Sequence, residues 1–157
     1  MFNLINNEKG VTLVELLASI VILSIILLSF LTFFTNSFQY NAISSDKMKA
    51  TNIAREVQEE FKVNPEKNQE LKNLILFSRS STETTIPKSS YPKLDLTNDI
   101  KKNSGILKLF LTKQNFIVEV EVDTNIDPKV DISLSKIHVQ VKKGTKLVSE
   151  TYTYLKN

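Results

Sequence analysis

A single carboxylate stands at the head of the longest apolar stretch of this chain. Glu15 is followed by LLASIVILSIILLSFLTFF, residues 16–34, and no charged residue occurs from Leu16 to Ser45. A carboxylate held among apolar groups costs several kcal/mol unless a cation or hydrogen-bond donors satisfy it. Glu15 is therefore the first residue whose type and position need a chemical explanation.

The simplest explanation is a helix cap. The order Thr12, Leu13, Val14, Glu15 fits the capping box, in which the threonine hydroxyl and the glutamate carboxylate each accept a hydrogen bond from a free backbone N–H of the first turn. An acid in the first turn also interacts favourably with the helix dipole. Capping alone would account for Glu15 structurally, so any functional role needs further evidence.

A second group of oxygen ligands invites a calcium hypothesis. Asp123, Asn125 and Asp127 alternate as in the first half of an EF-hand loop. The match then fails, because Pro128 stands where that loop needs glycine and Leu134 where it needs the bidentate glutamate. We expect a turn between strands here, and no metal site.

The remaining polar candidates have ordinary explanations too. Lys142, Lys143 and Lys146 cluster at a turn and could contact phosphate, which leaves DNA contact as an alternative. Exposed lysines at a turn more often keep a protein soluble and discourage edge-to-edge pairing of strands. His138 lies within a strand-like alternation and is expected to face away from the core.

Composition excludes several classes of enzyme. The chain has no cysteine and one histidine, which rules out disulfide frameworks, thiol catalysis and cysteine-ligated metals. No nucleophile–base pair, phosphate-binding glycine loop or paired acid site is visible in the sequence. A net charge of +3 does not by itself indicate a nucleic-acid-binding protein. We predict a protein without enzymatic activity.

The apolar run predicts a membrane anchor. As a helix, residues 16–34 would be about 28 Å long, close to the hydrocarbon thickness of a bilayer. A cleaved secretory signal is the alternative, but the run is too long and no small-x-small cleavage site follows it. Lys9 lies nearer the run than Lys47 and Lys49, which favours a cytoplasmic N-terminus.

The helical pattern continues beyond the apolar run. We expect one helix over residues 12–63, with a membrane-spanning part at residues 11–34 and an amphipathic continuation at residues 35–64. Pro65 disfavours helix at Asn64, which places the end there. The apolar stripe of the continuation comprises Phe38, Ala42, Met48, Ala50, Ile53, Ala54, Val57 and Phe61, of which those from Ala50 onward fit best.

The rest of the chain predicts a small sheet. Residues 65–104 are expected to hold a short helix at 66–77 and a variable loop at 78–104, and residues 105–157 an antiparallel sheet of about four strands. The fold class is therefore α+β, with a long N-terminal helix packed on that sheet. The expected strands are 105–112, 115–123, 135–142 and 146–155, with turns at 113–114 and 143–145. Alternation places one set of side chains on the core face and Glu119 and Glu121 on the opposite face; the core set is Phe116, Val118, Val120, Val122, Ile137, Val139 and Val141.

The N-terminal residues carry a specific resemblance. Gly10 to Leu17, GVTLVELL, resemble the class III signal of type IV prepilins and pseudopilins. The match combines a short polar leader that ends in Lys9 and Gly10, an acid at the fifth position after that glycine, and a following apolar run. The resemblance implies a pilin-like arrangement of helix and sheet.

The resemblance also implies processing and assembly. Residues 1–10 would be a leader peptide that a prepilin peptidase removes on the cytoplasmic face, between Gly10 and Val11. Val11 would become the N-methylated terminus, and its positive amine would be the counter-charge of Glu15 on a neighbouring subunit. The pairing would set the axial register of a filament, with Glu15 as the assembly residue.

The implied role is a minor type IV pilin or pseudopilin, a structural subunit of an envelope-spanning filament that belongs to a pilus, a competence DNA-uptake machinery or a type II secretion-like machinery. Implied partners are the peptidase, other pilin subunits, a membrane assembly platform and lipid, and no cofactor is implied. The lack of cysteine and the richness in Lys, Asn and Ile favour a Gram-positive competence or pilus system. The alternative is a single-pass, membrane-anchored extracellular binding protein that never assembles.

Overall fold

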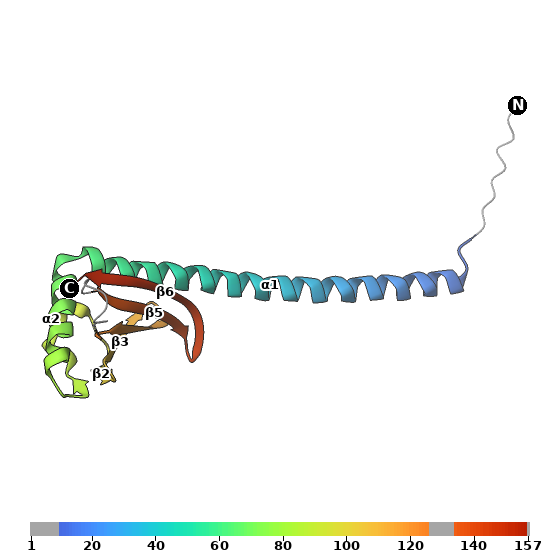
Figure 1. The fold of residues 1–157 in the computed structure, drawn as a ribbon. Helices are drawn as coiled ribbons and strands as arrows, with labels where there is room; N and C mark the ends of the chain where they lie inside the picture. The colour runs from blue at the N-terminus through green and yellow to red at the C-terminus, as the bar shows by residue number, and fades with distance from the viewer. Residues whose placement is uncertain (1–9, 126–133, 157) are drawn as a thin grey trace, which may run out of the picture. The chain divides into compact units, whose positions relative to one another are not determined.

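The computed structural model describes residues 10–125 and 134–156 (Figure 1). The chain divides into two units, Met1–Ile43 and Ser44–Asn157, and the boundary falls inside the first helix. This helix, α1, runs from Leu13 to Val63, close to the predicted 12–63. The apolar side chains of the part of α1 that belongs to the first unit are exposed. No glycine or proline interrupts the helix.

A proline ends the first helix and starts the second. Helix α2 (Pro65–Ser80) has Pro65 in its first turn and Asn64 as its N-cap residue. The Asn64 side chain accepts hydrogen bonds from the backbone N–H groups of Glu66 and Lys67, at 3.0 and 3.2 Å. Asn68 in turn donates to the carbonyl of Phe61 at 2.8 Å, so both helix ends at this corner are satisfied.

Helix α2 ends three residues later than the predicted 66–77. The prediction was wrong because Ser78 was counted as part of a polar loop. In the structure the Ser78 hydroxyl donates to the carbonyl of Ile75 at 2.8 Å, and the side chain is buried. A serine that bonds back to its own helix carries no free polar group into the core.

The sheet has six antiparallel strands, two more than predicted. They pair in chain order, each with its neighbour in sequence. The strands are β1 (Thr85–Ile86), β2 (Ile100–Asn103), β3 (Ile106–Lys113), β4 (Phe116–Asp123), β5 (Leu134–Lys143) and β6 (Lys146–Lys156).

The two additional strands lie in the segment predicted as a variable loop, residues 78–104. Ile86 of β1 pairs with Ile100 of β2, and both side chains are buried. Between them run two short 3₁₀ turns, η1 (Lys88–Ser90) and η2 (Pro92–Leu94). Strands of two and four residues are too short to show an alternating pattern, which is why the sequence did not reveal them.

The β3–β4 turn is displaced by one residue from its predicted position. Lys113 still pairs with Phe116, so the turn is formed by Gln114 and Asn115 rather than by Lys113 and Gln114. Gln114 adopts a positive φ of 54°. This left-handed conformation is uncommon for glutamine, and turn propensity alone does not point to it.

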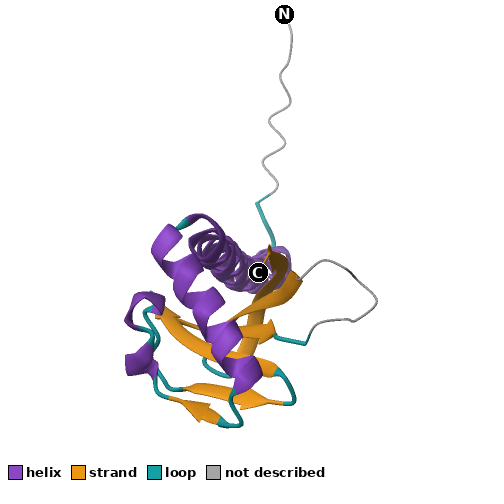
Figure 2. Cartoon of the chain, turned by 60° about the vertical axis from the view of Figure 1, so that its left-hand side comes forward, coloured by secondary structure: helices purple, strands orange, loops and turns teal. Residues whose placement is uncertain are grey.

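The core lies between the helices and one face of the sheet. Rows of side chains cross the strands as predicted, such as Leu109 opposite Val120 and Val120 opposite Val139. The part of α1 that belongs to the second unit and the whole of α2 cover that face, as Figure 2 shows. Their buried residues are Ala50, Ile53, Ala54, Val57 and Phe61 of α1 and Leu71, Leu74, Ile75 and Ser78 of α2.

The buried stripe of α1 is shorter than predicted. It begins at Ala50, whereas Phe38, Ala42 and Met48, which the periodicity had included, are exposed. Residues 35–43 belong to the other unit, and all of them except the half-buried Ser37 are exposed.

Candidate functional site

Gly10 and Val11 lie just before α1, in an exposed stretch of backbone. A methyl group added at Gly10 would meet no atom within 4 Å, and φ at this residue lies outside the left-handed region. Val11 is 70% exposed. The fold therefore gives no steric or conformational reason for glycine at position 10. Apart from Gly10, the predicted leader lies outside the described residues.

Half of the predicted capping box is present at the start of α1. The backbone N–H of Glu15 donates to the Thr12 hydroxyl at 3.3 Å and to the Thr12 carbonyl at 3.1 Å. No described residue donates a hydrogen bond to the Glu15 carboxylate, which is exposed. Threonine caps this helix, and the acid of Glu15 remains available to another molecule.

The hydroxyl groups of the apolar run are satisfied within the helix. Ser19, Ser24, Ser29 and Thr32 each donate to a backbone carbonyl three or four residues earlier, at 2.7 to 3.1 Å. Such bonds leave no free donor on the side of the helix. A segment of this kind can lie in hydrocarbon with all of these polar groups paired.

The start of α1 is long and apolar enough to cross a membrane, and it lies near the N-terminus. None of the residues of its most apolar stretch is buried by the rest of the chain. An exposed apolar surface of this size in water would drive aggregation. It needs lipid or other apolar helices around it.

A charged cluster holds α1 to the turn and loop beside it. The carboxylate of Glu60 lies 2.6 Å from the Lys67 ammonium and 2.7 Å from that of Lys113. Lys67 also contacts Asp95 at 2.7 Å, and Lys113 contacts Glu56 at 3.1 Å. Burial raises the pKa of Glu60, but the hydrogen bonds from the two lysines lower it by more, so that the pKa lies below its usual value.

A second cluster lies on the sheet face opposite the core. Glu119 is only 8% exposed and accepts hydrogen bonds from Lys142 and from Lys108, the latter at 2.9 Å. Burial raises its pKa, and the two lysines lower it by more. Lys108 also lies 2.6 Å from Glu121 and lowers the pKa of that carboxyl. The sequence placed Glu119 on this face but gave no sign that two lysines bury it.

His138 also lies on this open face, as predicted. Its ring stacks on Tyr152 with centroids 4.1 Å apart. Its two ring nitrogens lie 3.3 Å from a Glu121 oxygen and 2.9 Å from a Glu150 oxygen. Within the described part of the chain, no group of three or more His, Asp or Glu residues is placed to hold a metal ion.

The lowered pKa values of Glu60, Glu119 and Glu121 predict an acid-sensitive domain. Each carboxyl ionises more readily in the folded state, so its contribution to stability is present above the unfolded pKa of about 4.5. The contribution is lost as the pH falls through the lower folded values. Urea unfolding of the full chain in detergent, followed by near-UV circular dichroism, should give midpoints that drop below about pH 4.5.

A matched variant tests the cause of this pH dependence. Glu60→Gln should lower the free energy of unfolding by about 1–2 kcal/mol at pH 7, because it removes two charge-assisted hydrogen bonds. The loss should shrink as the pH falls below about 4.5, because Glu60 of the unfolded chain then becomes protonated, and it should vanish once the pH is also below the lowered pKa of Glu60 in the folded state. An equal loss at pH 7 and at pH 3 would mean that packing, and not charge, explains the effect.

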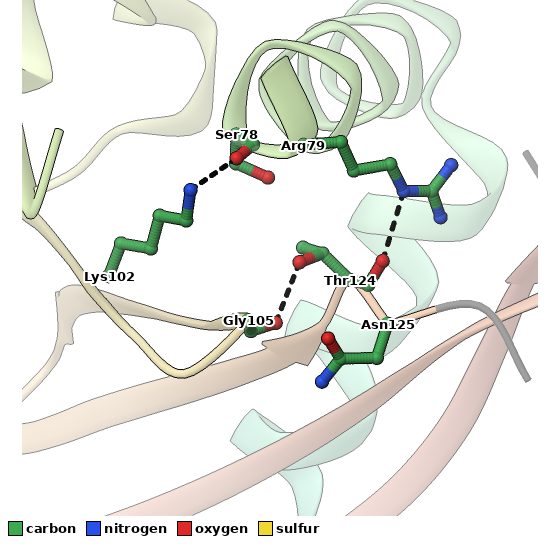
Figure 3. A pocket seen from close by; sticks show the side chains of 6 residues that line it. All are labelled: Ser78, Arg79, Lys102, Gly105, Thr124 and Asn125. Carbon is green, nitrogen blue, oxygen red and sulfur yellow. Dashed lines mark hydrogen bonds between the residues drawn. The ribbon is translucent and has the colours of Figure 1, made fainter. Parts of the chain in front are cut away.

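One pocket combines residues that the sequence did not bring together. It has a volume of about 390 Å³ and lies at the end of α2, beside the β2–β3 turn and the end of β4 (Figure 3). The lining residues are Ser78, Arg79, Lys102, Gly105, Thr124 and Asn125. They come from three segments that are far apart in sequence, residues 78–79, 102–105 and 124–125, and no motif links these segments.

The predicted calcium and phosphate residues are mostly engaged with the protein itself. Asp123, at the end of β4, accepts a hydrogen bond from the backbone N–H of Asn125 at 3.0 Å. Asp127 and Pro128 of the calcium hypothesis lie outside the described residues, and so does most of the expected turn. Lys142 is held by Glu119, and Lys143 lies 2.6 Å from Asp46, so two of the three clustered lysines already have an acidic partner.

Comparison with known proteins gives one match. Residues 5–31 match the family model described as the prokaryotic N-terminal methylation motif. No curated protein and no solved structure matches the chain. The matched region contains the glycine, the acid and most of the apolar run.

The motif and the exposed apolar helix agree. The model match covers the segment in which Gly10, Val11 and Glu15 lie, and α1 supplies a candidate membrane-spanning helix directly after it. Together they indicate a membrane-anchored protein. Residues 5–31 carry the signature of type IV pilins and pseudopilins, and they mark the chain as a pilin-like substrate of prepilin peptidase.

Proposed function

We propose that this protein is a minor type IV pilin or pseudopilin, a structural subunit of an envelope-spanning filament. The observation that carries the proposal is the N-terminal methylation motif placed at the head of an exposed, membrane-length helix. The sheet domain would lie outside the membrane and the N-terminus in the cytoplasm. The role is structural and not catalytic.

The surroundings of Gly10 support processing by another protein. Glycine is not required there by the fold, since a side chain would meet nothing and the backbone conformation is an ordinary one. An exposed, extended stretch before a helix is also the kind of segment that a peptidase can reach. Cleavage between Gly10 and Val11 would create a charged amine on Val11, two residues before α1 begins at Leu13.

The state of Glu15 supports assembly through charge pairing. Its carboxylate is not used by any described residue, and it lies at the head of a segment that must enter an apolar environment. In a bundle of such helices an unpaired carboxylate would cost several kcal/mol. The methylated amine of Val11 on a neighbouring subunit is the proposed partner, and a wrong axial stagger would leave both charges unpaired.

Mass spectrometry after co-expression with a prepilin peptidase tests the processing step. We expect a chain that begins at Val11 and carries one additional methyl group, and an uncleaved chain when the peptidase is inactivated by mutation. The variant Gly10→Val should remain uncleaved even with the active enzyme. Recovery of the intact N-terminus in the presence of active peptidase would overturn the proposal.

A membrane-anchored binding protein that does not assemble is the second candidate function. It is favoured by the pocket at the end of α2, which a purely structural subunit would not need. The two functions differ after processing. A filament subunit should sediment with sheared surface filaments, whereas an isolated binding protein should stay in the membrane fraction.

The machine that the filament would serve also belongs to the proposal. We place the protein in a pilus, a competence DNA-uptake system or a type II secretion-like system. The lack of cysteine and the richness in Lys, Asn and Ile support the Gram-positive competence and pilus systems. Deletion of the gene followed by assays of DNA uptake, surface adhesion and secretion would separate the three.

A further inference from the structure

Among the described residues, the pocket at the end of α2 is lined by two cations and by no acidic side chain. Its charged residues are Arg79 of α2 and Lys102 of β2, and the other four lining residues are neutral. Figure 3 shows the two side chains coming from different elements, with Lys102 bonded to Ser78 and Arg79 bonded through its Nε to Thr124. A cavity of this charge favours an anion over a cation or a neutral ligand.

Lys102 is already engaged with the protein backbone. Its ammonium donates to the carbonyls of Ser78 and Ser81, the latter at 2.5 Å, at the C-terminal end of α2. A cation at this end of a helix satisfies carbonyls that have no partner within the helix. Lys102 therefore has a structural role, and it contributes positive charge to the pocket without being free to move into it.

Arg79 is only partly engaged. Its Nε donates to the Thr124 carbonyl at 3.0 Å, which fixes one edge of the guanidinium. Its Nη2 is buried and has no hydrogen-bond partner within the described part of the chain. A buried N–H of a charged group without a partner is costly, and such a group in a folded protein needs an explanation.

The neutral lining residues do not supply the missing acceptor. The Thr124 N–H and hydroxyl both donate to the Gly105 carbonyl, at 2.8 and 2.7 Å. The Ser78 hydroxyl donates within its own helix. The Asn125 amide nitrogen has one long contact, 3.4 Å to the Ser104 carbonyl, and the Asn125 Oδ1 lies beside Gly105. None of Thr124, Ser78 and Asn125 accepts a hydrogen bond from Nη2, which therefore remains a donor without a partner among the described residues.

We propose that this pocket binds an oxyanion, a carboxylate or phosphate group, through the guanidinium of Arg79. The planar fork of arginine matches the oxygen pair of these groups and can bind them through two parallel hydrogen bonds. Arg79 is one of the residues that line the pocket, and Nη2 is its donor without a partner among the described residues. The site lies in the sheet domain and does not depend on the proposed filament function.

The chain offers an unusually clean experiment, because it contains only two arginines. Arg55 is exposed on α1 and lines no part of this pocket, so it is an internal control. The full chain, labelled with ¹⁵N and held in detergent micelles, would be titrated with inorganic phosphate and separately with acetate. The Nε–Hε signals of the two arginines would be followed at constant ionic strength, with chloride as the control anion.

We expect the Arg79 signal to shift and saturate with a dissociation constant of roughly 1 mM, an affinity of about 4 kcal/mol that suits one shallow charged site. The Arg55 signal should not saturate. Saturation by phosphate alone would identify a phosphate site. Saturation by both phosphate and acetate would identify a site that also accepts carboxylates. Chloride should not reproduce either shift.

Two variants test the role of the fork. Arg79→Lys keeps the charge and should weaken phosphate binding by about tenfold or more, because one ammonium cannot replace two parallel hydrogen bonds. Arg55→Lys should leave the affinity unchanged. Equal weakening by both variants, or no saturable shift at Arg79 in the unmodified chain, would overturn the proposal.

A third variant addresses an acceptor from the chain itself. Asp127 and Asp131 lie outside the described residues and follow Asn125 closely in sequence. If phosphate binds only after both are changed to asparagine, one of them is the natural partner of Arg79, and the site would not be a ligand site. Binding to the unmodified chain with unchanged affinity in this double variant is the result that we expect.

Discussion

Glu15→Val is expected to leave cleavage after Gly10 intact and to reduce incorporation into filaments by about tenfold or more. A free-energy difference of about 1.4 kcal/mol already changes an equilibrium constant tenfold. The loss of a charge pair in an apolar bundle costs more free energy than that. The measurement is the ratio of processed protein in sheared filaments to processed protein in the membrane. An unchanged ratio would leave Glu15 with a role at the helix terminus alone.

Two further variants separate charge pairing from helix capping. Glu15→Gln keeps a side chain that can complete a capping box but removes the charge, so it should be as defective as Glu15→Val. Thr12→Val removes the hydroxyl that accepts from the Glu15 N–H, and it should assemble nearly normally. The reverse pattern, with a normal glutamine variant and a defective Thr12→Val, would show that the cap and not the charge is what assembly needs.

Phe61→Ala is expected to have the largest effect on stability, a loss of about 3–5 kcal/mol in the free energy of unfolding. Phe61 is fully buried in the last turn of α1, where the helix packs into the core of the sheet domain. A domain of this size is held by about 5–15 kcal/mol, so much of the total would be lost. Urea unfolding of the full chain in detergent, followed by near-UV circular dichroism, gives the value.

The matched control is the same substitution on the same helix outside the core. Phe38 is 70% exposed and belongs to the other unit of the chain. Phe38→Ala should change the free energy of unfolding of the sheet domain by less than about 0.5 kcal/mol. Similar losses for both variants would mean that α1 as a whole, and not the packing of its last turns, sets the stability of the domain.

The long elements of this fold can be predicted from the sequence because each has a strong local pattern of apolar residues. The apolar run and the following stripe define α1 to within one residue at either end, and Pro65 marks the break. The alternation from Phe116 to Val122 assigns each side chain of β4 to its correct face. In these segments the period of the apolar residues agrees with the structure that buries them.

The short elements and the polar contacts cannot be predicted from the sequence in this way. Strands β1 and β2 depend on the pairing of Ile86 with Ile100, which lie fourteen residues apart in a stretch rich in serine and threonine. The burial of Glu119 by two lysines depends on the register of β3, β4 and β5. Contacts of this kind arise only from the tertiary fold, and no local pattern encodes them.

The candidate site shows the same division. Gly10, Val11 and Glu15 lie within six consecutive residues, so their spacing is visible in the sequence. The pocket joins Arg79 to Thr124, forty-five positions apart, through a bond to a backbone carbonyl. A carbonyl is present at every residue, so nothing in the sequence distinguishes the one that Arg79 contacts.

The pairing of every strand with its immediate neighbour has a consequence for export. In the orientation proposed above, a chain anchored by its N-terminus would deliver the sheet domain across the membrane unfolded, with β1 the first strand to emerge and β6 the last. Each hairpin can close as soon as its second strand has crossed, without waiting for a distant partner, and local pairing of this kind folds quickly. Translocation and folding can thus proceed in the same direction, which suits a chain that has no disulfide to hold partly folded states together.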